Sequence, residues 1–184
     1  EPVHVQMIEY IDPPHQKEQY VGGKANIPRM INSMVEATPR NALLVRNICK
    51  EVEEGRYVLV LSDRRSHLEC LSNLVGLSVP DTVTRGLYVG GMTDKQRELS
   101  NQCRVIFATY TMASEAYDNK NLNTVVLATP KSKVEQSVGR ILRGEVQTMQ
   151  PRVIDMADMY SMFESFARNR LNFYRRQRYT VDRR

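Results

Sequence analysis

The chain has 184 residues, of which 41% are hydrophobic, and a formal net charge of +5 at pH 7. This length suits one domain, or one domain with an appendage, and the apolar fraction is enough to fill a sizeable core. No apolar run approaches the roughly 20 residues of a membrane span, and no signal peptide is visible, which argues against a membrane protein. The basic balance permits a nucleic-acid partner without requiring one.

Cysteine and histidine spacing gives no sign of a metal site. Cys49, Cys70 and Cys103 lie far apart and have no CxxC spacing, so we expect small buried hydrophobic residues in a reducing compartment. The three histidines also lack the spacing of metal ligands. The sequence therefore predicts neither zinc nor another metal bound by this chain.

Apolar runs and helical spacings alternate along the sequence. In chain order we expect a strand at 3–8, a polar loop at 12–24, helices at 27–35 and 40–54 separated at Pro39, a strand at 57–61, a helix at 64–75, a strand at 86–89, a helix at 94–100, strands at 104–108 and 124–128, a helix at 134–143, a strand at 152–156 and a terminal helix at 162–178. Continuous apolar strands that alternate with helices predict an α/β fold, with a parallel sheet covered by helices on both faces. Working residues in such sheets lie in loops at the carboxyl ends of strands, here 62–64, 90–92, 109–118 and 129–131.

The most informative segment reads Q-x-x-G-R-x-x-R and covers 136–143. On a helix, Gln136, Arg140 and Arg143 share one face. The opposite face is apolar and consists of Val134, Val138, Ile141 and Leu142. Because a guanidinium keeps its charge and donates paired hydrogen bonds, the polar face is suited to phosphate. A solvated basic helix face is the alternative interpretation of the arginines alone.

The loop 109–118 follows an expected buried strand. It is rich in hydroxyl groups and ends in two carboxylates, Glu115 and Asp118. It can present Thr109 and backbone N–H groups to a phosphodiester, and a carboxylate to a ribose hydroxyl. An ordinary polar loop that caps a helix is the alternative.

Taken together, these segments resemble superfamily 2 helicases. Residues 58–64 resemble motif IV, 105–118 motif V and 136–143 motif VI, in the order that the family has them. The resemblance implies that 1–184 is a single RecA-like helicase C-terminal domain with a basic C-terminal helix at 160–178. The tail 153–158 and the residues after it resemble helicases of large DNA viruses, a group that includes the poxvirus transcript-release helicase. The later residues that carry this resemblance are Phe163, Phe166, Arg170, Tyr174 and Tyr179. An intracellular location follows, in cytoplasm or nucleus, or for a viral protein in host cytoplasm or virion.

The resemblance also implies roles for individual residues. Arg140 and Arg143 would reach the γ-phosphate, and Gln136 would sense the closed state of the motor. Asp118, Glu115 and Gly139 are expected on the nucleotide side. Arg64, Gly91 and Thr109 are expected to grip the backbone of DNA or RNA. One departure is Ala116, which stands where the family usually has a glycine.

No G-x-x-x-x-G-K-[ST] sequence occurs in the chain, since 22–25 lacks both the first glycine and the hydroxyl. ATP and Mg²⁺ would therefore be bound mainly by an N-terminal RecA-like domain outside this sequence. That domain would be a partner of this one in the same protein, and the 184 residues alone are expected to be inactive.

The terminal helix combines an aromatic stripe, interpreted as core packing, with several arginines. Arg175 and Arg176 are candidates for nucleic-acid contact, and a solvated basic face is the alternative. Two other functions also stay open for the whole chain. It would also fit a double-strand DNA translocase or restriction-type motor, or an ATP-independent nucleic-acid-binding module.

Overall fold

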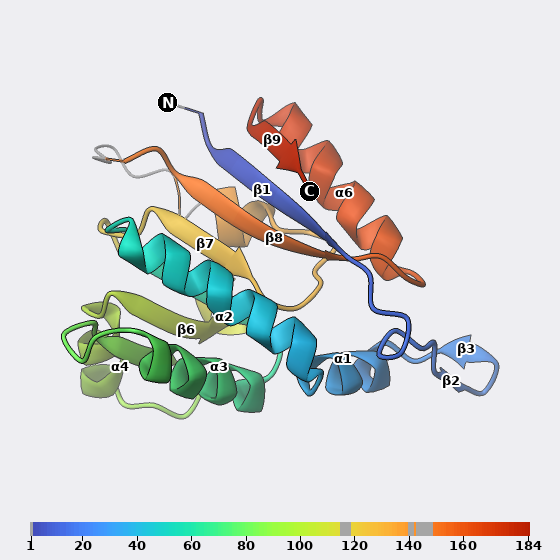
Figure 1. The fold of residues 1–184 in the computed structure, drawn as a ribbon, viewed down its shortest axis with the longest axis horizontal. Helices are drawn as coiled ribbons and strands as arrows, with labels where there is room; N and C mark the ends of the chain where they lie inside the picture. The colour runs from blue at the N-terminus through green and yellow to red at the C-terminus, as the bar shows by residue number, and fades with distance from the viewer. Residues whose placement is uncertain (1, 115–118, 140–141, 143–148) are drawn as a thin grey trace.

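The computed structural model describes residues 2–114, 119–139, 142 and 149–184. Its centre is a seven-stranded sheet with the order β5-β6-β4-β7-β8-β1-β9, in which each strand pairs in parallel with its neighbours (Figure 1). The strands of this sheet are β1 His4–Tyr10, β4 Val58–Ser62, β5 Arg85–Tyr88, β6 Val105–Thr109, β7 Thr124–Leu127, β8 Arg152–Asp158 and β9 Thr180–Arg183. The predicted parallel sheet is confirmed.

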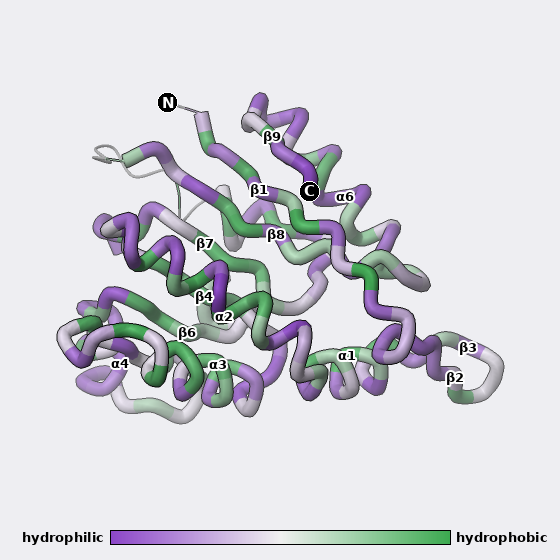
Figure 2. The backbone as a smooth tube through the Cα atoms, viewed as in Figure 1, coloured by the Kyte–Doolittle hydropathy of each residue, from purple (hydrophilic) through white to green (hydrophobic). Residues whose placement is uncertain are grey.

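Helices cover both faces of the sheet, as expected. They are α1 Ile27–Val35, α2 Thr38–Glu53, α3 Arg65–Ser78, α4 Asp94–Asn101, α5 Tyr110–Ser114, a short π-helical turn η1 at Glu135–Gly139, and α6 Phe163–Arg176. Side chains alternate along β4, so Leu59 and Leu61 pack beneath η1 and α6, while Val58 and Val60 pack beneath α2 and α3. Hydrophobic residues run along β6 and β7, whereas α4 is largely hydrophilic (Figure 2). The chain thus has the α/β architecture of RecA-like domains.

Several local expectations need correction. Pro39 does not lie between the two helices but inside the first turn of α2, where a missing N–H costs little. The polar loop 12–24 contains most of a hairpin, formed by β2 Tyr20–Val21 and β3 Lys24–Ala25. None of the three cysteines is fully buried as expected, since Cys70 is exposed and Cys49 and Cys103 are partly exposed. Strand β9 was not expected, because its sequence is polar, and it lies at the edge of the sheet beside β1.

A buried histidine links the helices of one face to the end of β4. The His67 ring is 1% exposed, and its Nε2–H donates to Asn41 Oδ1 over 2.8 Å. Its Nδ1 accepts from the Ser62 hydroxyl over 2.9 Å, and Asn41 Nδ2 donates to Val35 O. Both ring nitrogens are therefore occupied with the imidazole neutral. Burial, and secondarily the charge of Arg40, lower the pKa of His67 to about 3.

This histidine predicts an acid-dependent loss of stability. Because the folded pKa lies below the ordinary value of about 6.5, the unfolded chain binds the extra proton as pH falls through that range. The free energy of unfolding should be unaffected above about pH 6.5 and should fall below it by up to about 1.4 kcal/mol per pH unit. Urea unfolding between pH 7.5 and 5 measures this slope.

The variant His67→Gln should be less stable than the wild type at pH 7.5 but should show a flatter pH dependence. His15→Gln is the matched control, since that imidazole is largely solvent-exposed. Equal slopes for His67→Gln and wild type would contradict the assignment.

Candidate functional site

The candidate site lies at the carboxyl edge of the sheet, where β6, β4 and β7 are neighbours. Ser62 is level with Thr109, and Leu61 is level with Leu127. The segments that follow these strands therefore meet at one edge. They are the segments that resemble motifs IV and V, together with the segment 128–131 that leads into motif VI.

Segment 128–131 is held through three of its carbonyl groups. Arg40 Nη1 donates to Ala128 O over 2.6 Å, the Tyr110 hydroxyl donates to Thr129 O over 2.7 Å, and Arg170 Nη1 donates to Lys131 O over 2.8 Å. The Thr129 hydroxyl also accepts from the backbone N–H of Asp63 over 2.9 Å. Donors from α2, α5 and α6 thus fix this segment.

The two arginines are buried and each is paired with a carboxylate. Arg40 donates to both oxygens of Asp158 over 2.8 Å, and Arg170 does the same to Asp155. The Tyr174 hydroxyl also donates to Asp155, over 2.6 Å. Burial disfavours the charge of Arg170, but the Asp155 carboxylate outweighs it and raises the pKa of the guanidinium above its ordinary value.

The motif VI segment keeps its expected apolar side. Val134, Val138 and Leu142 are buried, and Gln136 is exposed. The expected α-helix is instead a π-helical turn over the described part, although Leu142 N–H still bonds to Val138 O over 3.1 Å. Gly139 is buried, and a Cβ there would lie 3.9 Å from Phe173 Cζ, so this position packs against α6. Arg140, Ile141 and Arg143 lie outside the described residues.

The motif V segment begins with a helical turn rather than an open loop. Thr109 Oγ1 accepts from Met112 N–H at the start of α5. This places Thr111 and Ser114 in a hollow of about 450 Å³ with Gln136, Lys131 and other side chains. The structure therefore brings Gln136 beside the motif V segment. Glu115, Ala116 and Asp118 lie outside the described residues.

The candidates for nucleic-acid contact are distributed over two regions. Arg64 lies at the end of β4, but its guanidinium turns toward α1 and donates to Asn32 Oδ1 over 2.8 Å. Gly91 lies in an exposed turn after β5 with a φ of 83°, a conformation that favours glycine. Arg175 and Arg176 are exposed on α6, and Arg176 Nη2 lies 3.7 Å from Glu135 Oε1. Their roles stay predictions.

The site also contains residues that sequence reasoning missed. Tyr110 and Lys131 lie in loops that were expected to carry function, so only their roles were overlooked. Arg40 gave no signal, because it lies in a helical pattern far in sequence from the segment that it holds. Arg170 was named only among the tail residues that resemble viral helicases, and that resemblance gave it no role. Among the described residues, no three His, Cys, Asp or Glu side chains form a metal-binding group. The same residues include no helix with the length and hydropathy to cross a bilayer.

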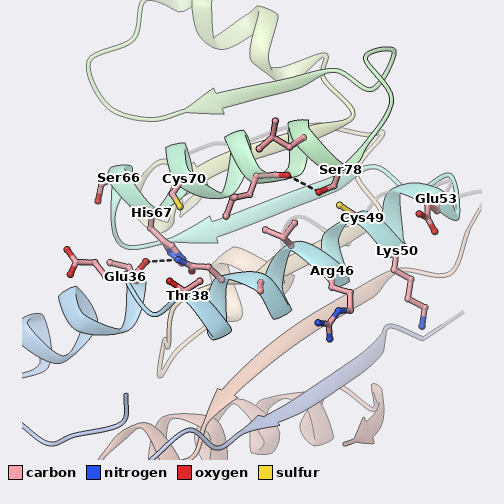
Figure 3. Close-up of a pocket in the computed structure, with 16 residues that line it drawn as sticks. Glu36, Thr38, Arg46, Cys49, Lys50, Glu53, Ser66, His67, Cys70 and Ser78 are labelled. Carbon is pink, nitrogen blue, oxygen red and sulfur yellow. Dashed lines mark hydrogen bonds between the residues drawn. The ribbon is translucent and has the colours of Figure 1, made fainter. Parts of the chain in front are cut away.

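A larger hollow of about 990 Å³ lies between α2 and α3, away from these motifs (Figure 3). Its wall is mainly apolar and includes Leu74 and Leu77, the latter 86% exposed. Figure 3 shows His67 at one end of it, directed at α2. Among the described residues of 58–64, 105–118 and 136–143, none lines this hollow. His67, which does line it, is hydrogen-bonded to Ser62 of the motif IV segment.

The sequence of the chain is similar to that of a viral protein. The chain is 33% identical over 171 residues to L396 of Acanthamoeba polyphaga mimivirus, which is provisionally named an ATP-dependent RNA helicase. The match covers 91% of this chain and 33% of the relative, so the chain spans about a third of the relative's length. No family model matches.

Solved structures agree in fold. UvsW of phage T4 matches 100% of this chain and 41% of its own, with a TM-score of 0.72 and 21% identity. The yeast DEAD-box splicing factor Prp28 matches 99% of this chain and 35% of its own, with a TM-score of 0.61 and 15% identity. The chain is a helicase-like domain with a RecA-like fold. In this domain the motif-like segments meet at the edge of the sheet where working residues of α/β folds lie.

The buried pairs of this helicase-like domain predict a large difference between nearby arginines of α6. Arg170→Ala leaves Asp155 buried without its partner, so the free energy of unfolding should fall by about 3–5 kcal/mol. Arg168→Ala, on the exposed side of the same helix, should change it by less than about 0.5 kcal/mol. Urea denaturation of both variants tests this, and equal shifts would contradict the assigned role of the pair.

Proposed function

We propose that this chain is the second motor domain of an ATP-dependent nucleic-acid helicase. The observation that carries the proposal is the meeting of three segments at the carboxyl ends of neighbouring strands, in a chain 33% identical to L396. Two of these segments resemble motifs IV and V, and the third leads into motif VI. ATP and Mg²⁺ would be held mainly by a separate RecA-like domain, because the chain has no phosphate-binding P-loop sequence.

The proposed mechanism is closure of a cleft between the two domains. ATP bound to the other domain draws this one toward it, and Arg140 and Arg143 stabilise charge that develops on the γ-phosphate. Gln136 reports the closed state, and its position beside α5 supports this assignment. Asp118, Glu115 and Gly139 serve the nucleotide side in this proposal.

Arg64, Gly91 and Thr109 are proposed to hold the nucleic-acid backbone while the cleft opens and closes. Arg64 follows β4, Gly91 follows β5 and Thr109 ends β6. These three strands are neighbours in the sheet, which supports a common track for the nucleic-acid strand. Contacts to phosphate and sugar carry little sequence information, so binding should tolerate any sequence. DNA and RNA are both suitable partners on this basis.

The arginine assignment is testable in the protein that contains both domains. Arg140→Ala and Arg143→Ala should each lower nucleic-acid-stimulated ATPase by about 10³-fold or more. Thermal stability should barely change, because these positions were assigned to the solvent side of the segment. Phosphate release is measured with and without oligonucleotide.

Arg46→Ala is the matched control, since Arg46 is exposed on α2 and lies outside the helicase-like motifs. Full ATPase activity in both motif variants would refute the finger assignment. The 184-residue chain alone should release no phosphate above background, and robust turnover by it would show that the catalytic site is not shared.

The nucleic-acid assignment of α6 has its own test. Arg175→Gln and Arg176→Gln together should weaken oligonucleotide binding and flatten the salt dependence by up to about two units, about one for each lost phosphate contact. The double variant Arg29→Gln and Arg46→Gln removes the same charge from exposed positions elsewhere. If the two double variants bind alike, α6 presents only a solvated basic face.

A further inference from the structure

Lys131 is a surface cation on an unusually well-fixed backbone. In the segment 128–131, three backbone carbonyl groups, including that of Lys131, accept hydrogen bonds. The donors are Arg40, Tyr110 and Arg170. Two of these donors come from opposite faces of the sheet, since α2 and α6 pack on different sides. The Cα of Lys131 is therefore held in place by the core of the domain rather than by a loose loop.

The Lys131 side chain is oriented as well as anchored. Its Nζ lies 5.0 Å from the centre of the Tyr110 ring and 3.7 Å from Asp63 Oδ1. The side chain nevertheless stays 41% exposed and lines the hollow beside α5. A lysine normally loses considerable rotamer freedom when it binds a ligand, and contacts that restrict it beforehand reduce that cost.

The charges around the hollow favour an anion. Lys131 and Lys133 line it together with the hydroxyls of Thr111 and Ser114, and its one described carboxylate is Glu135. Glu135 lies 3.7 Å from Arg176 of α6, which offsets its charge. Asp63 is not among the lining residues, so its carboxylate touches Lys131 from outside the hollow.

We propose that Lys131 and this hollow form a phosphate-binding site in which Asp63 is an exchangeable counter-ion. An entering phosphate replaces Asp63 as the partner of the ammonium, while Asp63 keeps its contacts with Thr129. The phosphate belongs either to the nucleic-acid backbone or to the nucleotide, and this part of the inference rests on the proposed motor function. The site itself requires only the geometry of this chain.

Pyrophosphate titrated into the 184-residue chain tests the site without any motor activity. Lys131→Gln should weaken binding about tenfold, and Lys131→Arg should keep it within about threefold, because the charge is retained. Asp63→Asn should strengthen binding about threefold, since it removes the competing carboxylate. Lys50→Gln is the control, an exposed lysine on α2. Backbone amide shifts at 129–137 locate the bound anion, and thermal melting monitors the fold of each variant.

The opposite effects on pyrophosphate affinity expected for Lys131→Gln and Asp63→Asn distinguish a binding role from a structural role. If Lys131 and Asp63 only stabilise the segment as a pair, both Lys131→Gln and Asp63→Asn should lower thermal stability and weaken any binding together. That result overturns the proposal, as does a Lys131→Gln titration that matches wild type or the Lys50→Gln control.

ATPase kinetics of the two-domain protein identify whether the bound phosphate belongs to the nucleic-acid backbone or to the nucleotide. If Lys131→Gln raises the nucleic-acid concentration for half-maximal ATPase and leaves the KM for ATP unchanged, the site binds the backbone. The reverse pattern assigns it to the nucleotide, and either pattern supports the site. No change in either parameter, in a wild-type enzyme that is active, overturns it. A wild-type protein without stimulated ATPase refutes the motor proposal instead, and the pyrophosphate titration then still decides whether the site exists.

Discussion

Two buried arginine–carboxylate pairs constrain the working edge of this domain. Arg40 reaches it from α2 and Arg170 from α6, and both donate to carbonyls of the segment after β7. Removing a charge from water costs several kcal/mol, and such a pair is tolerable only when its geometry is good and its remaining groups are bonded. Here each guanidinium meets both oxygens of a carboxylate and a carbonyl as well. The segment is therefore fixed to both helix layers at once.

That constraint explains how a sheet edge could present the proposed phosphate-binding groups in a fixed geometry. Loops at the ends of strands carry function in α/β folds, but a mobile loop holds a ligand poorly. In this domain α5 also joins the arrangement, because the Tyr110 hydroxyl bonds to Thr129 O. The motif V segment, the segment 128–131 and η1 consequently share one local framework. A shift of any one of them would alter the hollow that Gln136 lines.

Much of the fold was predictable because it depends on local patterns. The apolar runs at 57–61, 104–108 and 124–128 correspond to β4, β6 and β7, since a strand buried on both faces leaves a continuous hydrophobic signal. The buried side of 134–142 was predictable from the same kind of spacing. Strand β9 was not, because three of its four side chains are polar. Its position depends on pairing with β1 and on the packing of Val181 against the core, which involve residues far away in the sequence.

The supporting residues of the site were beyond sequence reasoning for a different reason. Arg40 and Asp158 are 118 positions apart, so no periodicity within one element connects them. Arg170 lies among exposed arginines on α6, and composition alone cannot separate it from Arg168. The same limit applies to His67, whose partners belong to β4 and α2. Sequence motifs indicate which groups meet the ligand, whereas the groups that hold them appear only when distant elements are packed together.

In the proposed motor the catalytic site is shared between two domains. This gives a physical reason for having one set of residues that meets the ligand and another set that holds the first in place. Phosphoryl transfer depends on positioning and on charge stabilisation, and both are sensitive to displacements of about 1 Å. In the proposed motor, the domain that carries the arginines must move between cycles, so its own groups need an internal reference that does not move. The buried pairs provide one, because they tie the edge of the sheet to the hydrophobic core on both faces. Closure can then be a rigid-body motion that brings a preorganised edge to the nucleotide, without a loop having to fold at each cycle.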